Sequence, residues 1–173
     1  AETYQVGGAT GYITSSSGSN TITTIWVAST DESAIDLSTA QIRITPYDGT
    51  EAGSTSTSSN FNLDLTAPTV SSMTYKDTDT DGDVDRIDVT FDETIGLDEC
   101  EAADYTIGGA DAGSLAVASC ATSGSDLQLT LSGGASMDTN ITVTLAYTAS
   151  NGTANSIDDA YSNAAAAVTA TSE

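Results

Sequence analysis

The chain has 173 residues, 38% of them hydrophobic, and it carries 25 Asp or Glu against three Lys or Arg and no His, so its formal net charge is −22. The lack of His excludes a Ser/His/Asp triad and His-ligated zinc, and two Cys cannot form an all-thiolate zinc site. The scarcity of cations argues against nucleic acid and anionic lipid as partners, and no run approaches the roughly 20 apolar residues of a membrane span. We therefore expect no membrane insertion, and a protein that binds cations or performs no chemistry.

Residues 1–67 are predicted to form an N-terminal β-rich region. Apolar and polar residues alternate in several short runs, which is typical of strands with one buried face. Strands are expected around Tyr4–Val6, Tyr12–Thr14, Thr21–Ala28, Gln41–Thr45 and Phe61–Leu65. The Gly/Ser/Thr-rich stretch Gly49–Asn60 is predicted to be a surface loop, and a boundary is expected near Pro68. A region this short has a thin core, so it should share a sheet with the rest of the chain or with a neighbouring molecule.

Residues 68–173 are predicted to form a β-sandwich. Hydrophobic residues recur with a period of two, as in Ile87/Val89/Phe91 and Leu127/Leu129/Leu131, and Gly- and Asn-rich turns separate the runs. About seven strands in this length match an Ig-like domain, and no long amphipathic helix is visible. The predicted fold class is all-β, an Ig-like β-sandwich with an additional N-terminal β-rich portion.

The stretch from Asp77 to Asp88 matches a calcium-binding loop. Acidic residues fall at its first, third, fifth, ninth and twelfth positions, and Gly82 at the sixth permits a tight turn. Ca²⁺ takes six to eight oxygen ligands, and alternate side chains of a turning loop converge on one point. Val84 would anchor the loop on the core, and the backbone carbonyl of Asp83 would supply the seventh-position ligand. The predicted metal-site residues are Asp77, Asp79, Asp81, Asp83, Asp85 and Asp88.

The twelfth position departs from the usual pattern, because it is Asp88 rather than Glu and belongs to a predicted strand rather than a helix. The alternative interpretation of the loop is a solvated acidic hairpin. Two further acidic groups, Asp92 to Glu101 and Asp158-Asp159, could each bind another cation, but they are interpreted mainly as solvated surface. Paired carboxylates also occur in glycosidases, but one Trp and two Phe do not suggest an aromatic sugar cleft, so no catalytic residue is predicted.

The two cysteines, Cys100 and Cys120, suit a disulfide that closes a loop of about 20 residues and stabilises the fold by ~3 kcal/mol. A buried reduced pair is the alternative, but the other features of the chain indicate an extracellular protein, which favours the disulfide. Asn140 and Asn151 begin N-glycosylation sequons, and Ser15–Ser17 and Ser54–Ser59 could carry O-glycans. Plain loops are the alternative for all of these.

Several stretches carry a family resemblance: Thr66-Ala-Pro-Thr-Val70, Tyr75 to Gly82, Asp85 to Phe91, Val143 to Tyr147, and Ile157 to Ala164. They resemble the calcium-binding Ig-like repeats of bacterial and archaeal surface proteins, as found in S-layer proteins and adhesins. The resemblance implies a seven-stranded sandwich with calcium between its first two strands and a structural or adhesive role. In that family a Gly usually stands where this chain has Ser162.

The function expected from these features is that of a secreted structural subunit of a cell-surface filament, sheath or S-layer. The subunit would polymerise with itself by β-strand addition and would be stabilised by Ca²⁺. The segment Glu2–Ser16, with Tyr4, Val6 and Tyr12 on one side of a strand, is the candidate donor, and pairing within its own domain is the alternative. The other class is a monomeric adhesin or spacer domain of a larger surface protein, with affinity for a glycan or host protein.

Overall fold

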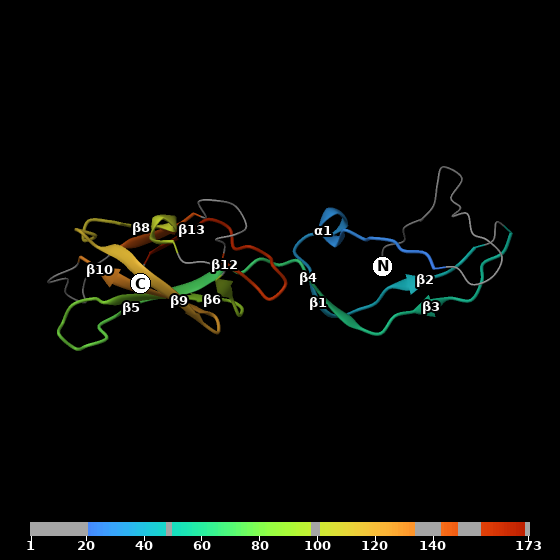
Figure 1. The fold of residues 1–173 in the computed structure, drawn as a ribbon, viewed down its shortest axis with the longest axis horizontal. Helices are drawn as coiled ribbons and strands as arrows, with labels where there is room; N and C mark the ends of the chain where they lie inside the picture. The colour runs from blue at the N-terminus through green and yellow to red at the C-terminus, as the bar shows by residue number, and fades with distance from the viewer. Residues whose placement is uncertain (1–20, 48–49, 98–100, 134–142, 149–156, 172–173) are drawn as a thin grey trace. The chain divides into compact units, whose positions relative to one another are not determined.

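A computed structural model describes residues 21–47, 50–97, 101–133, 143–148 and 157–171. The chain forms two compact units, Ala1–Asp64 and Leu65–Glu173. Its regular structure is mostly β, which confirms the predicted fold class (Figure 1). No helix in the described ranges combines the length and the apolar character needed to cross a bilayer.

The first unit contains one helical turn and two small antiparallel ladders. Strand β1 (Asp36–Ala40) pairs with β4 (Phe61–Asp64), and β2 (Arg43–Ile44) pairs with β3 (Ser56–Thr57). The helical turn α1 spans Ala28–Asp31. None of the described residues up to Asp64 is buried, which agrees with the thin core expected from the length of this region.

The strand predicted over Thr21–Ala28 is wrong. Residues 21–27 belong to no strand, and Ala28 instead begins α1. Local hydrogen bonds explain the turn: the Thr30 hydroxyl donates to the Val27 carbonyl at 2.6 Å, and the Trp26 indole donates to Asp31 at 2.7 Å. Short polar side chains of this kind offer the backbone an alternative to strand pairing. The predicted loop over residues 49–60 also differs, because it contributes β3.

The second unit contains two main sheets. The four-stranded sheet has the order β5-β6-β10-β9, and the three-stranded sheet has the order β13-β11-β8. Two short strands, β7 (Gly96–Leu97) and β12 (Ile157–Asp158), pair with each other, and a 3-10 turn spans Ala102–Asp104. The remaining strands are β5 (Val70–Lys76), β6 (Arg86–Phe91), β8 (Tyr105–Gly108), β9 (Ala116–Ser123), β10 (Asp126–Ser132), β11 (Thr144–Tyr147) and β13 (Val168–Thr171).

One hydrophobic cluster joins both main sheets of the second unit. The predicted alternation is confirmed, because Ile87, Val89 and Phe91 of β6 are buried together with Leu127 and Leu129 of β10. From the other sheet, β8 and β11 contribute Tyr105, Leu145 and Tyr147 to the same cluster.

Two tyrosine hydroxyls bond to the backbone of neighbouring segments and so help to fix the sandwich. The Tyr75 hydroxyl donates to the Val143 carbonyl at 3.2 Å and accepts the Val143 N–H at 2.9 Å. The Tyr147 hydroxyl accepts the Ile157 N–H at 3.0 Å. Each bond gives a tyrosine hydroxyl in the packed interior the partner that buried polar groups require. The result is a framework on which the loop between β5 and β6 is carried.

Candidate metal centre

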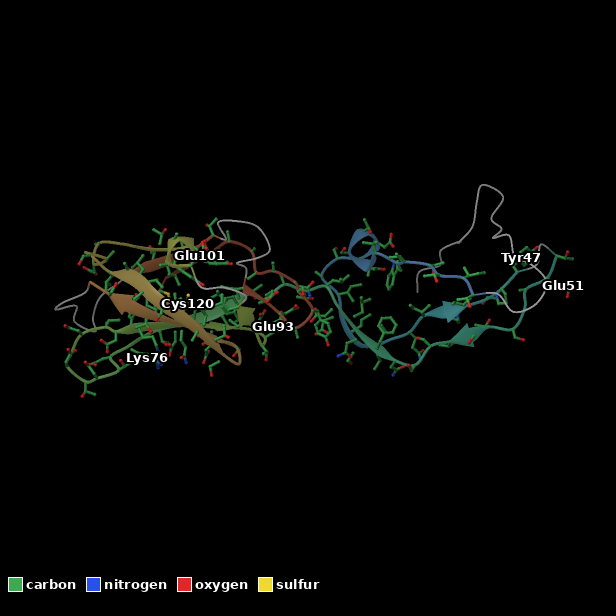
Figure 2. All side chains as sticks on the ribbon, viewed as in Figure 1. Tyr47, Glu51, Lys76, Glu93, Glu101 and Cys120 are labelled. Carbon is green, nitrogen blue, oxygen red and sulfur yellow. The ribbon has the colours of Figure 1, made fainter. Side chains whose placement is uncertain are left out.

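The predicted calcium loop connects β5 to β6 and extends from one end of the sandwich (Figure 1). Lys76 and Arg86 are register partners at its base, and the Asp85 N–H donates to the Lys76 carbonyl at 2.9 Å. The Asp85 carbonyl in turn accepts the N–H of Leu131 in β10 at 2.7 Å. Figure 2 shows the labelled Lys76 beside this loop. Both ends of the loop are therefore held by strands of the packed sheet.

Three of the predicted ligands lie together at this loop. Carboxylate oxygens of Asp77, Asp79 and Asp85 all fall within 4.8 Å of one another. They occupy the first, third and ninth positions of the predicted calcium loop. Oxygen-only ligand sets of this kind suit a hard divalent cation such as Ca²⁺.

Backbone N–H groups of the loop point at Asp77 and fix its carboxylate. The Thr80 N–H donates to one oxygen at 2.6 Å, and the Gly82 N–H donates to the other at 3.0 Å. This tight turn requires left-handed backbone at two residues, Thr80 with φ 65° and Gly82 with φ 97°. Glycine tolerates that region, as predicted for Gly82, whereas a β-branched residue such as Thr80 rarely adopts it.

Asp85 is held by a threonine on the opposite side of the loop. The Thr78 N–H and hydroxyl both donate to Asp85 Oδ2, at 2.6 and 2.8 Å. These hydrogen bonds stabilise the ionised carboxylate and lower the pKa of Asp85 below its ordinary value. Asp85 is therefore positioned as a charged, acceptor-only group at neutral pH.

The pKa of Asp79 is shifted in the opposite direction to that of Asp85. The Asp81 N–H donates to it at 3.2 Å and by itself lowers its pKa. Desolvation and the negative charges of Asp81 and Asp85 outweigh that bond, so the net pKa of Asp79 is raised above its ordinary value. Mutual repulsion among these carboxylates is the condition that a bound cation relieves.

The carboxylates of the other three predicted residues do not belong to this group of three. Asp81 accepts the Asp83 N–H at 2.9 Å within the loop, and the adjacent Val84 is buried, as expected for the loop anchor. Asp88 lies in β6, where the Arg86 guanidinium engages both of its carboxylate oxygens. The structure thus brings together the carboxylates of Asp77, Asp79 and Asp85, with Asp81 next to Asp79, while the Asp88 carboxylate pairs with Arg86. The predicted backbone ligand, the Asp83 carbonyl, stays a prediction.

Two kinds of residue around this loop were not predicted from the sequence. Thr78 and Thr80 supply hydrogen bonds that shape the loop, and the Arg86 guanidinium binds the Asp88 carboxylate. For Arg86 and Asp88 a signal was available, since opposite charges two residues apart in a strand lie on the same face. For the threonines, Ser and Thr residues alternating with Asp are typical of turns closed by side-chain hydrogen bonds.

The remaining candidate residues are only partly described. Cys120 lies in β9 and packs against the core, but Cys100 is outside the described residues, so their disulfide stays a prediction. The sequon residues Asn140 and Asn151 and the donor-strand residues Tyr4, Val6 and Tyr12 also lie outside them.

Two residues of the groups interpreted as solvated acidic surface have structural partners. Asp92 accepts the Thr69 N–H and hydroxyl at 2.8 and 2.6 Å. Asp159 is buried and accepts both the backbone N–H and the side-chain amide of Asn163. Asp92 therefore ties the residue before β5 to the end of β6, 23 positions along the chain, whereas Asp159 closes a local turn.

Comparison with known proteins identifies the family of the second unit. No curated protein and no solved structure matches the chain. The sequence profile described as "Bacterial Ig-like domain" matches residues 64–172, which cover the whole sandwich and its acidic loop. Domains of this family are generally non-catalytic and typical of surface proteins. The two-sheet architecture, the shared core and this match lead to one conclusion: the chain belongs to the bacterial Ig-like domain family.

Proposed function

We propose that the chain is a structural subunit of an extracellular cell-surface filament, sheath or S-layer, and that its Ig-like unit binds Ca²⁺ between β5 and β6. The convergence of Asp77, Asp79 and Asp85 within 4.8 Å carries the calcium part of this proposal. The family match supports the surface and non-catalytic parts, because these domains are typical of surface proteins.

Calcium suits the loop better than other cations do. The donors are carboxylates carried on a turn that lies outside the packed core, and Ca²⁺ accepts flexible geometry with six to eight oxygens. Magnesium demands a near-octahedral shell and retains its waters, so it gains less from several protein carboxylates. Backbone carbonyls of the loop and water would complete the coordination. The raised pKa of Asp79 is the electrostatic cost that the ion would remove.

Self-assembly by strand addition is supported by the first unit. Strand β1 pairs on one side with β4, and no described strand pairs with its other edge. A two-stranded ladder is marginally stable alone, and an open edge offers backbone groups to another strand. The segment Glu2–Ser16 is the proposed donor. Repetition of such a head-to-tail contact produces an open polymer.

The second candidate function is a monomeric adhesin or spacer domain of a larger surface protein. The second unit favours it, because that unit has a continuous core from both sheets and needs no partner to bury it. This alternative keeps the calcium loop as a stabilising device but expects no polymer.

One experiment separates these functions. The full chain would be examined by sedimentation and electron microscopy with Ca²⁺ and with chelator, and calcium binding would be measured by titration calorimetry. We expect Ca²⁺-dependent polymers from the native chain and loss of binding in the triple variant Asp77→Asn/Asp79→Asn/Asp85→Asn. The matched control Asp111→Asn changes an exposed aspartate outside the cluster and should bind like the native chain. A monomer at every calcium concentration would favour the spacer, and unchanged binding by the triple variant would refute the site.

A further inference from the structure

We infer that residues Thr21–Val27, here called the uncharged segment, form a docking surface for a second copy of this chain. The inference rests on the proposed self-assembly and adds the location of a contact. It is carried by the exposure, the strand preference and the charge of these seven residues.

The uncharged segment holds an unusual amount of exposed hydrophobic surface. Its four large apolar side chains have exposed fractions of 53% for Ile22, 88% for Ile25, 40% for Trp26 and 57% for Val27. Of the nine large hydrophobic side chains exposed in the described ranges, eight lie in the first unit. Scattered exposed apolar residues are ordinary, but a contiguous group of them marks an interaction site.

The local preference of this segment conflicts with its conformation. All seven residues are Thr, Ile, Trp or Val, which are enriched in strands because their side chains suit a pleated surface. The structure nevertheless assigns none of them to a strand. As a strand, the segment would direct Ile25 and Val27 to one face and Ile22 and Trp26 to the other. Apolar side chains on both faces are typical of a strand covered on both sides.

Charge identifies the occupant as another copy. The chain carries −22, so two copies repel each other over most of their surface, yet residues 3–30 contain no Asp, Glu, Lys or Arg. A second copy brings the same charge-free region, and two such regions can meet with few carboxylates between them, the exception being Asp31, whose charge is bonded to the Trp26 indole. A cationic partner would instead be attracted to the acidic remainder of the chain. Self-association is therefore the contact that this region suits.

The segment is anchored at its C-terminal end, which limits the entropy that Trp26 and Val27 lose on docking. The Trp26 indole is held by Asp31 at 2.7 Å, and the Thr30 N–H donates to the Val27 carbonyl at 3.1 Å. These bonds join the segment to α1 and direct the chain towards β1. Preorganisation of this kind reduces the ordering cost of an interface.

The sole tryptophan provides a direct test. The full chain with Ca²⁺ would be compared as monomer and as assembly by Trp26 emission and by acrylamide quenching. We expect a blue-shifted emission and a several-fold lower quenching constant in the assembly, because docking covers the indole. An assembly in which Trp26 remains as accessible as in the monomer would overturn the inference while leaving the proposed polymer intact.

A pair of matched variants locates the contact. Ile25→Asp places a charge in the uncharged segment, and Ile44→Asp makes the same change at another exposed isoleucine, in β2. We expect Ile25→Asp to remain monomeric with unchanged calcium binding, and Ile44→Asp to assemble like the native chain. Assembly by Ile25→Asp, or equal loss in both variants, would overturn the assignment to this segment. A native chain that never assembles would overturn both this inference and the proposed polymer.

Discussion

Arg86 and Asp88 form an ion pair between two residues of one strand. Arg86 Nε lies 2.7 Å from Asp88 Oδ1, and an Arg86 terminal nitrogen donates to Oδ2 at 3.0 Å. Both side chains project from the face of β6 opposite Ile87 and Val89, and the Arg86 and Asp88 side chains are 30% and 12% exposed. The pair explains why the twelfth position of the predicted calcium loop does not join Asp77, Asp79 and Asp85.

Removing the arginine alone should destabilise the second unit. Arg86→Met leaves the nearly buried Asp88 carboxylate without its counter-charge, and we expect a loss of about 2 kcal/mol in the free energy of unfolding, less than for a fully buried pair. The double variant Arg86→Met/Asp88→Leu removes both charges and should recover most of that loss. Denaturant unfolding of the two variants measures the difference. If both are equally destabilised, the interaction is packing rather than charge.

The second unit was largely predictable because its strands obey a single local rule. Ile87, Val89 and Phe91 alternate with polar residues, and the structure buries all three. Residues 21–27 also have strand preference, but none of them pairs with a described strand, and the bonds made by Trp26 and Thr30 favour the helical turn that begins at Ala28. Preference predicts a strand only where a partner strand is present, and a sequence does not state which partner is present.

The sequence predicts where the candidate site lies but not which of its carboxylates meet. Alternating aspartates indicate a cation loop, and the carboxylates of three predicted residues, Asp77, Asp79 and Asp85, meet. The sequence spacing does not specify which carboxylates are bound by other side chains of the protein, as Asp88 is by Arg86. That outcome depends on side-chain directions set by β6, where the loop has already ended.

Gly133 is constrained by both its backbone and its surroundings. Its φ is 87°, and a Cβ there would overlap the Ser114 carbonyl oxygen. We expect Gly133→Ala to lower the free energy of unfolding by about 3 kcal/mol or more, because backbone must shift to accept it. Gly124 is the matched control, because its φ is 65° but a Cβ there would meet no atom within 4 Å beyond its chain neighbours. Gly124→Ala should cost only about 1 kcal/mol, the strain of left-handed backbone. Equal losses by thermal unfolding would contradict the steric argument.

Ser162 occupies a position that suits glycine. Its φ is 66°, and its N–H donates to the Asp159 carbonyl at 3.2 Å to close a turn. Ser162→Gly relieves left-handed strain but adds entropy to the unfolded chain, so we expect a net gain of about 0.5 kcal/mol. Ser119→Gly, in β9, should instead cost about 1 kcal/mol, because that strand residue has no positive φ to relieve. Opposite signs in calorimetric melting temperatures would support this interpretation, whereas two losses would refute it.

Asp92 should make stability depend on pH through Thr69. The two hydrogen bonds from Thr69 lower the pKa of Asp92 in the folded chain below its ordinary value. Their stabilisation is therefore complete above the unfolded pKa of about 3.9 and is lost as the pH falls through the lower folded pKa. Thr69→Val should be less stable than the native chain at neutral pH, and the difference should shrink in strong acid. Thr122→Val, at an exposed residue of β9, is the control. A difference that is constant with pH would show that the Thr69 hydroxyl does not act through Asp92.

Asp79 should reverse the sign of its effect when calcium is added. Its folded pKa is raised, so ionisation opposes folding of the metal-free chain above the unfolded pKa of about 3.9, and this penalty disappears as the pH falls below the unfolded pKa. Asp79→Asn removes that repulsion and should raise the melting temperature in chelator at neutral pH. With Ca²⁺ the same variant loses a ligand, so its melting temperature should fall below that of the native chain. Asp111→Asn should follow the native chain in both conditions. Because repulsion and coordination require the same carboxylate, only a cation at this loop produces both signs, and a variant that shifts equally with and without calcium would rule that cation out.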